Sequence, residues 1–126
     1  MHTVNNPLGW TRNERTMLVL LAAIQVLLGS VALLAAHEAD HTWSTLLFLS
    51  QPLVLFGLSG PILVLLGSRW LGTIMAGFHA ACTIVVTSAI QGFATEGGPF
   101  VRGIVYGGEL LAMLLLLGMV SFTRRD

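Results

Sequence analysis

The sequence is poor in charged residues and in cysteine. Only 10% of its 126 residues are charged and 55% are hydrophobic, whereas about a quarter of a soluble domain is usually charged. A chain of this size buries too little surface to hide so much apolar side chain, so lipid is its natural solvent. The formal net charge is zero, which leaves no basic surface for a nucleic-acid partner and no acidic tail.

Cys82 is the single cysteine and lies within an apolar run. One thiol excludes an intrachain disulfide and any zinc or iron–sulfur motif built from several cysteines. Lysine is absent as well, so all six cationic side chains are arginine.

Four apolar runs follow a polar N-terminal stretch. Each has about 20 residues, the length that crosses a hydrocarbon core of ~30 Å at 1.5 Å per residue. Helices satisfy every backbone amide within lipid, and the short alternating segments of a membrane barrel are missing. The sequence therefore predicts an all-α, four-transmembrane-helix bundle that forms a single domain over residues 1–126, with helices at about 17–36, 44–67, 70–93 and 100–122.

The arginines predict the orientation of these helices. Five of the six precede the first run, follow the fourth or lie between the second and third, and Arg102 is the exception. The positive-inside rule places that side in the cytoplasm, together with both termini. The first run, Met17 to Ala36, is longer than the apolar part of a signal peptide, so we expect it to remain as a helix. The predicted location is a cell membrane, crossed several times, in a bacterium or archaeon.

Each predicted helix carries one strongly polar residue near mid-depth. Counted from the cytoplasmic end, Gln25 and His79 lie at ~13 Å, and Gln51 and Glu109 at roughly 18–20 Å. Ionisable residues at such depth are costly unless they face protein or water, which makes them functional candidates. Arg102 lies seven residues before Glu109 on the same helix face, so an ion pair or an aqueous vestibule from the outer side is one alternative. A neutral Glu109 that donates a hydrogen bond to His79 or to a glutamine is another.

A structural role for the same residues stays open. Hydrogen bonds from glutamine, histidine and glutamate commonly hold membrane helices together, at about 0.6–2 kcal/mol each. The sequence does not decide between helix contact and proton chemistry for Glu109, His79, Gln25 and Gln51.

Histidines near the end of the first helix form a second candidate site. The stretch from His37 to His41 matches the H-E-x-x-H pattern in which two histidines hold zinc, but no third ligand follows at a suitable spacing. A surface metal site from His37, His41 and Asp40 is one expectation, and a plain polar loop is the alternative. A membrane haem usually needs two axial ligands at matching depth, and His79 is the single histidine within the predicted spans, so haem would require a partner subunit or a second copy.

Small residues and prolines mark special positions in three helices. Two sets let neighbouring helices approach closely: Gly103 and Gly107 on the last helix, and Gly72, Ala76 and Ala80 on the third. Pro52 and Pro61 each remove a helix hydrogen bond, so the second helix is predicted to be kinked or locally unwound, as some helices that line binding sites are.

The sequence contains no motif diagnostic of a known family and no complete catalytic set, which disfavours an enzyme. It favours a non-catalytic subunit of a larger membrane complex, respiratory or otherwise electron-transferring, with other membrane subunits or copies of itself as partners. A homo-oligomeric channel or transporter for protons or small solutes, using Glu109 and His79, is the first alternative. A haem- or metal-binding membrane redox protein is the second.

Overall fold

A computed structural model of the chain describes residues 8–38, 42–89 and 98–122. In these residues it is all-helical, with four segments long and apolar enough to cross a membrane. The second segment is divided by a short π-helical turn, η1. In chain order the elements are α1 (Arg12–Glu38), α2 (Trp43–Ser50), η1 (Gln51–Leu55), α3 (Phe56–Leu65), α4 (Arg69–Ala89) and α5 (Gly98–Phe122).

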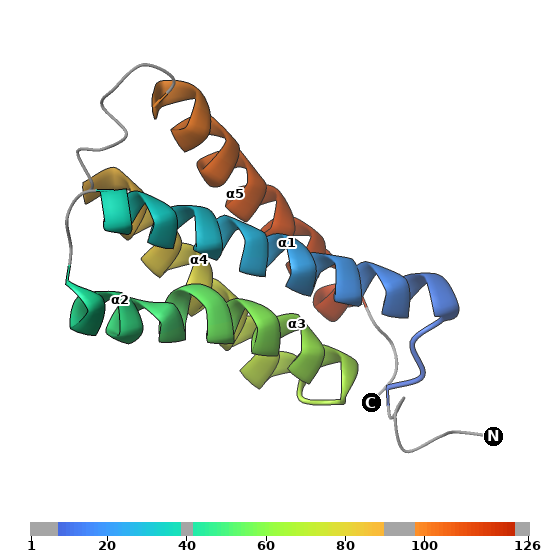
Figure 1. Cartoon of the computed structure of the whole chain (residues 1–126). Coiled ribbons are helices and arrows are strands. Elements are labelled where there is room, and N and C mark those ends of the chain that lie inside the picture. The colour runs from blue at the N-terminus through green and yellow to red at the C-terminus, as the bar shows by residue number, and fades with distance from the viewer. Residues whose placement is uncertain (1–7, 39–41, 90–97, 123–126) are drawn as a thin grey trace.

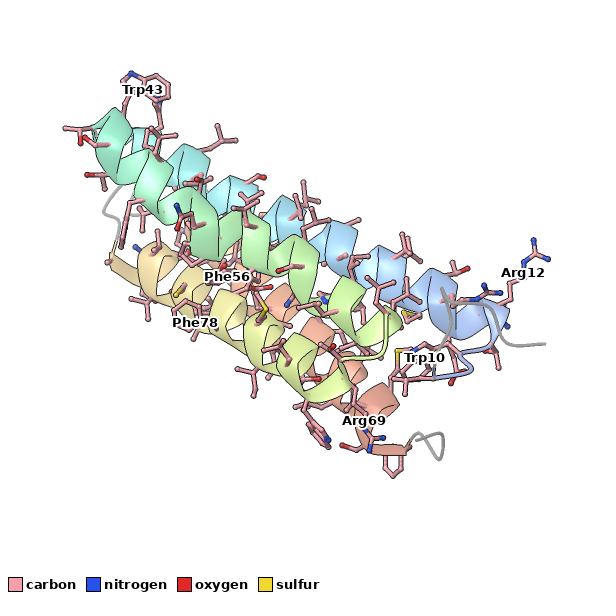
Figure 2. All side chains as sticks on the ribbon, turned by 90° about the horizontal axis from the view of Figure 1, so that it is seen from below. Trp10, Arg12, Trp43, Phe56, Arg69 and Phe78 are labelled. Carbon is pink, nitrogen blue, oxygen red and sulfur yellow. The ribbon has the colours of Figure 1, made fainter. Side chains whose placement is uncertain are left out.

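The fold class predicted from the sequence is thus confirmed as four long apolar helices. Large apolar side chains project outward from the helices, as Figure 2 shows; the exposed fraction is 64% for Leu27, 73% for Phe48 and 62% for Leu110. Contiguous apolar surface on this scale is unusual for a soluble monomer, so these helices suit a multi-pass membrane protein. The cytoplasmic placement of the two termini remains a prediction.

The first helix begins earlier than predicted, at Arg12, because a capping box precedes it. The backbone N–H of Glu14 donates to the Thr11 hydroxyl at 3.2 Å, and the Thr11 N–H donates to the Glu14 carboxylate at 2.8 Å. Each side chain thereby satisfies a backbone donor that the first helical turn leaves open.

The helices form a bundle in which α1 packs against α3, α4 and α5 (Figure 1). A tight turn joins α3 to α4, where Gly67 adopts a φ of 113° that side chains rarely allow. In Figure 1, α5 runs obliquely to α1, and its N-terminal end stands away from the other helices. Figure 2 shows Trp10 and Arg69 at one end of the bundle and Trp43 at the other; we call these the Trp10 end and the Trp43 end.

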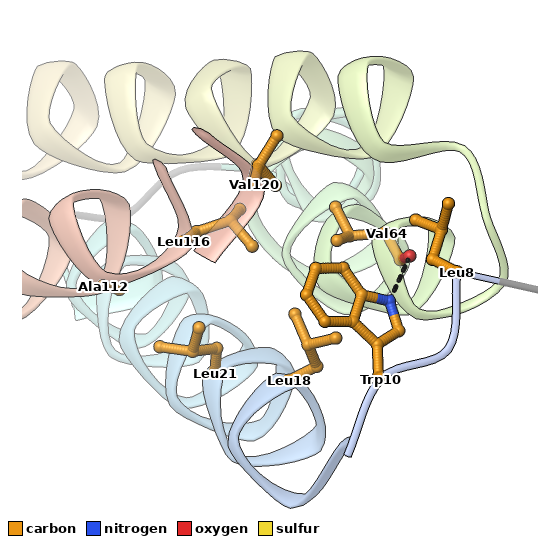
Figure 3. Packing of buried hydrophobic residues seen from close by; sticks show 9 residues of the cluster. Leu8, Trp10, Leu18, Leu21, Val64, Ala112, Leu116 and Val120 are labelled. Atoms are coloured by element: carbon orange, nitrogen blue, oxygen red, sulfur yellow. Dashed lines mark hydrogen bonds between the residues drawn. The ribbon is translucent and has the colours of Figure 1, made fainter. Parts of the chain in front are cut away.

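A cluster of buried apolar residues closes the Trp10 end (Figure 3). The indole of Trp10 is 2% exposed, and its Nε1–H donates to the carbonyl of Val64 at 3.2 Å. Leu18 of α1 and Leu116 of α5 pack into the same cluster. This cluster joins the segment before α1 to the ends of α3 and α5, so it fixes the relative positions of helices that are distant in sequence.

Candidate functional site

A histidine and a glutamate meet in the interior of the bundle, between α4 and α5. The Nε2 atom of His79 lies 3.0 Å from Oε2 of Glu109, and both side chains are fully buried. The contact is close in distance but does not meet hydrogen-bond geometry, and neither Glu109 oxygen has an aligned donor among the described residues. A buried carboxyl group without aligned donors is costly. The energy of this contact therefore depends on which of the two side chains carries the proton.

The other ring nitrogen of His79 is held by the π-helical turn. Nδ1 lies 3.1 Å from the carbonyl oxygen of Pro52. In η1 the Phe56 N–H bonds to the carbonyl of Gln51, five residues back, rather than to that of Pro52, four residues back. The turn thereby leaves the Pro52 carbonyl available to the histidine. The irregularity predicted in the second helix is present at Pro52 as this π-helical turn, which faces His79, whereas α3 continues through Pro61 without a break.

Two glycines make room for the imidazole ring. A Cβ atom placed on Gly57 would lie 2.8 Å from both Cε1 and Nδ1 of His79. A Cβ atom on Gly29 would lie 3.0 Å from Cε1 of the same ring and 1.6 Å from the carbonyl oxygen of Leu53. Both positions therefore require glycine, and α1, η1 and α3 enclose His79 in a narrow slot.

The contacts of His79 limit its protonation states. A carbonyl oxygen only accepts, so Nδ1 carries a proton. Nε2 is then either bare, facing a protonated Glu109, or protonated, facing a Glu109 carboxylate. Both arrangements have zero net charge and differ by the position of one proton across a 3.0 Å gap. Adding or removing a proton would leave a net charge in a buried site, which is expensive.

The two predicted glutamines occupy different environments. Gln25 of α1 is 1% exposed, and its Nε2–H donates to the sulfur of Met113 at 3.9 Å, while its Oε1 has no partner among the described residues. Gln51 faces outward instead. It borders a lateral groove of about 480 Å³, together with Phe56, Phe78 and Cys82. The structure thus brings His79 and Glu109 into contact and leaves Gln51 outside this site.

Arg102 is half-buried two turns before Glu109 on α5, toward the Trp43 end. The ion-pair contact found for Glu109 is with His79.

Only one of the two histidines predicted to bind metal lies within the described residues. Asp40 and His41 are outside the described residues, and His37 is exposed, with its ring centroid 5.6 Å from that of Trp43. Within the described part of the chain, no three histidine, cysteine or acidic side chains group as metal ligands would. Both ring nitrogens of His79 have partners, so a haem iron could bind it only by displacing Glu109 or Pro52.

The small residues named from the sequence also separate into two groups. A Cβ atom on Gly72 would lie 2.4 Å from the carbonyl oxygen of Gly60, and Ala76 and Ala80 are buried. Gly103 and Gly107, by contrast, have open space where a Cβ would stand. The first group lies at the contact between α3 and α4, whereas the second faces outward from α5.

Sequence reasoning missed two threonines that extend this site. Thr83 and Thr87 are fully buried, and the Thr83 hydroxyl lies 3.4 Å from Nε2 of His79. The signal was present in the spacing, because residues four apart share a helix face and the series continues from His79 to both threonines.

No family model, curated protein or solved structure matches the chain. The geometry of the His79–Glu109 contact is therefore the basis for a proposed function.

Proposed function

We propose that this chain is a small proton-handling membrane protein, acting as a homo-oligomeric transporter or channel in which the His79–Glu109 pair binds and releases the proton. The observation that carries the proposal is the 3.0 Å contact between two fully buried ionisable side chains. Ionisable residues within membrane helices are costly and are commonly found on ion and proton pathways.

The surroundings of the pair support a site that changes state rather than a fixed helix contact. The glycine slot and the Pro52 carbonyl hold the imidazole in one orientation, and the Glu109 carboxyl lacks aligned donors. A contact selected for stability would satisfy these oxygens. Irregular π-helical turns are also frequent at functional sites.

Proton flux through proteoliposomes that enclose a pH-sensitive dye tests the proposal. We expect the purified protein to carry a pH-dependent proton flux. Glu109→Gln should abolish it, because the amide of glutamine does not ionise and cannot bind and release the transported proton. Glu14→Gln is the matched control. It makes the same chemical change at the exposed start of α1 and should leave the flux unchanged.

Helical content and thermal unfolding of each variant separate loss of function from loss of fold. A folded Glu109→Gln protein with wild-type flux would show that the pair is a structural contact, and the proposal would then be wrong.

The second candidate function is a non-catalytic subunit of a larger membrane complex. The outward face of α5 favours it, because at Gly103, Gly107 and Gly118 no atom of the described residues lies within 4 Å of the position that a Cβ would take. Such small-residue faces allow another helix to approach closely.

Native mass spectrometry of the protein extracted in mild detergent from its own membrane distinguishes the two candidates. Co-extraction with other membrane subunits in fixed ratio supports the subunit role. A homo-oligomer without other chains supports transport.

A further inference from the structure

A line of hydroxyl groups runs along α4 from the His79–Glu109 pair toward the Trp43 end. Thr83 and Thr87 follow His79 at intervals of four residues, and all three side chains are fully buried. At 1.5 Å per residue each step is about 6 Å, a distance that one water molecule can bridge. The described part of α4 ends at Ala89, so Thr87 lies within one turn of the last described residue of this helix.

The hydroxyl groups of this line are directed differently from those of Thr73 and Ser30. Thr73, on the same helix, donates to the carbonyl of Arg69 four residues back, and Ser30 donates to that of Val26. This local bond is the usual way to satisfy a buried hydroxyl in a helix. Thr83 instead contacts His79, and the Thr87 hydroxyl has no partner among the described residues although its side chain is fully buried.

A second element faces the same line. The spans of α4 and α5 run in opposite directions (Figure 1). Beyond the His79–Glu109 contact, the Ser88 hydroxyl of α4 and the Tyr106 hydroxyl of α5 lie 2.5 Å apart. Val86 of α4 and Val101 of α5 both pack against the buried cluster of Ala35, Ala36 and Leu46. The two helices therefore still share contacts beside Thr87.

From these observations we infer that Thr83 and Thr87, with water between them, form the route by which protons pass between the Trp43 end and the His79–Glu109 pair. This inference rests on the proposed function and names its access path. When Nε2 of His79 is bare, the Thr83 hydroxyl gives it a proton and takes one from the water beyond it; that water takes a proton from Thr87, and Thr87 takes one from solvent at the Trp43 end. The pair then carries one extra proton as a transient net positive charge. Each hydroxyl ends the step intact, with its O–H direction reversed.

Buried oxygen atoms that lack hydrogen-bond partners are the reason to expect water molecules beside Thr87 and Glu109. Buried polar groups without protein partners commonly bind ordered water, and the Thr87 hydroxyl and Oε1 of Glu109 are such groups among the described residues. Cys82 of α4 borders the lateral groove rather than this line, and the titratable side chains of α5 toward the Trp43 end are Tyr106, whose hydroxyl is paired with that of Ser88, and Arg102. From α1 the facing polar residue is Gln25, and η1 and α3 contain no titratable side chain.

Hydroxyl-deleting variants measured in the proteoliposome assay test the route. Thr83→Val and Thr87→Val remove one hydroxyl each at nearly constant volume, and both should slow proton flux several-fold. Thr83→Ser keeps the hydroxyl and should retain most of the flux. Thr73→Val is the matched control on the same helix, because its hydroxyl is bound to the backbone, and it should behave like wild type.

Infrared titration of the Glu109 carboxyl band provides a second readout. With the route impaired, the band should appear at the same pH as in the wild type but more slowly after a pH jump. If Glu109→Gln abolishes flux while both valine variants match Thr73→Val, the route is overturned and the proposed function stands. If a folded Glu109→Gln variant leaves flux unchanged, the proposed function is overturned and the route falls with it.

Discussion

The glycines around His79 and those on the outer face of α5 look alike in the sequence but meet opposite surroundings. Gly29 and Gly57 stand where the Leu53 carbonyl or the His79 ring comes so close that a Cβ would overlap it. Gly103, Gly107 and Gly118 have no atom of the described helices and turns within 4 Å of that position. The first group holds the chain's own helices together around a polar site, and the second is available to another helix. Three substitutions test this difference.

Gly29→Ala should have the largest effect, because its Cβ would stand 1.6 Å from the carbonyl oxygen of Leu53. Overpacking a core typically costs about 1–3 kcal/mol, and we expect a loss at the upper end of this range or beyond it. Unfolding in mixed detergent micelles measures it. Gly107→Ala is the matched control and should remain within about 1 kcal/mol of wild type; equal losses in the two variants would remove the distinction between the faces.

Gly57→Ala should have an intermediate effect on stability. Its Cβ would press on Cε1 and Nδ1 of His79 at 2.8 Å, and the ring is held by Pro52 and cannot turn away freely. We expect a loss of about 1–2 kcal/mol together with reduced proton flux. Gly118→Ala serves as the control. A Gly57→Ala protein with unchanged flux would mean that the orientation of His79 is not important.

Gly107→Leu should change stability least and association most. The position is open to its surroundings, so the larger side chain fits the monomer, but it would block close approach of a second helix. Mass spectrometry of the intact oligomer or complex should show dissociation. Val85→Leu, at a side chain that is 65% exposed on α4, is the control for added bulk on the surface. Retained association in Gly107→Leu would exclude this face of α5 as the interface.

The long apolar runs made the four helices predictable, because membrane-length helices depend on composition more than on tertiary contacts. Pro52 also marked the irregular second helix in advance. The partner of Glu109 was open between His79, Arg102 and a glutamine, since sequence fixes depth along a helix but not the rotation of one helix against another. The same rotation turns Gln51 outward, although its depth resembled that of Glu109. The role of Gly57 depends on how α3 approaches α4, which no local pattern reports.

The contacts of the His79 ring are the basis of the account, and nitrogen-15 NMR of the labelled imidazole in lipid bilayers tests them directly. We expect a proton on Nδ1, hydrogen-bonded to the Pro52 carbonyl, and an Nε2 signal that shifts in Glu109→Gln while the Nδ1 signal stays nearly constant. A bare Nδ1, or an Nε2 signal that is insensitive to Glu109→Gln, would contradict it.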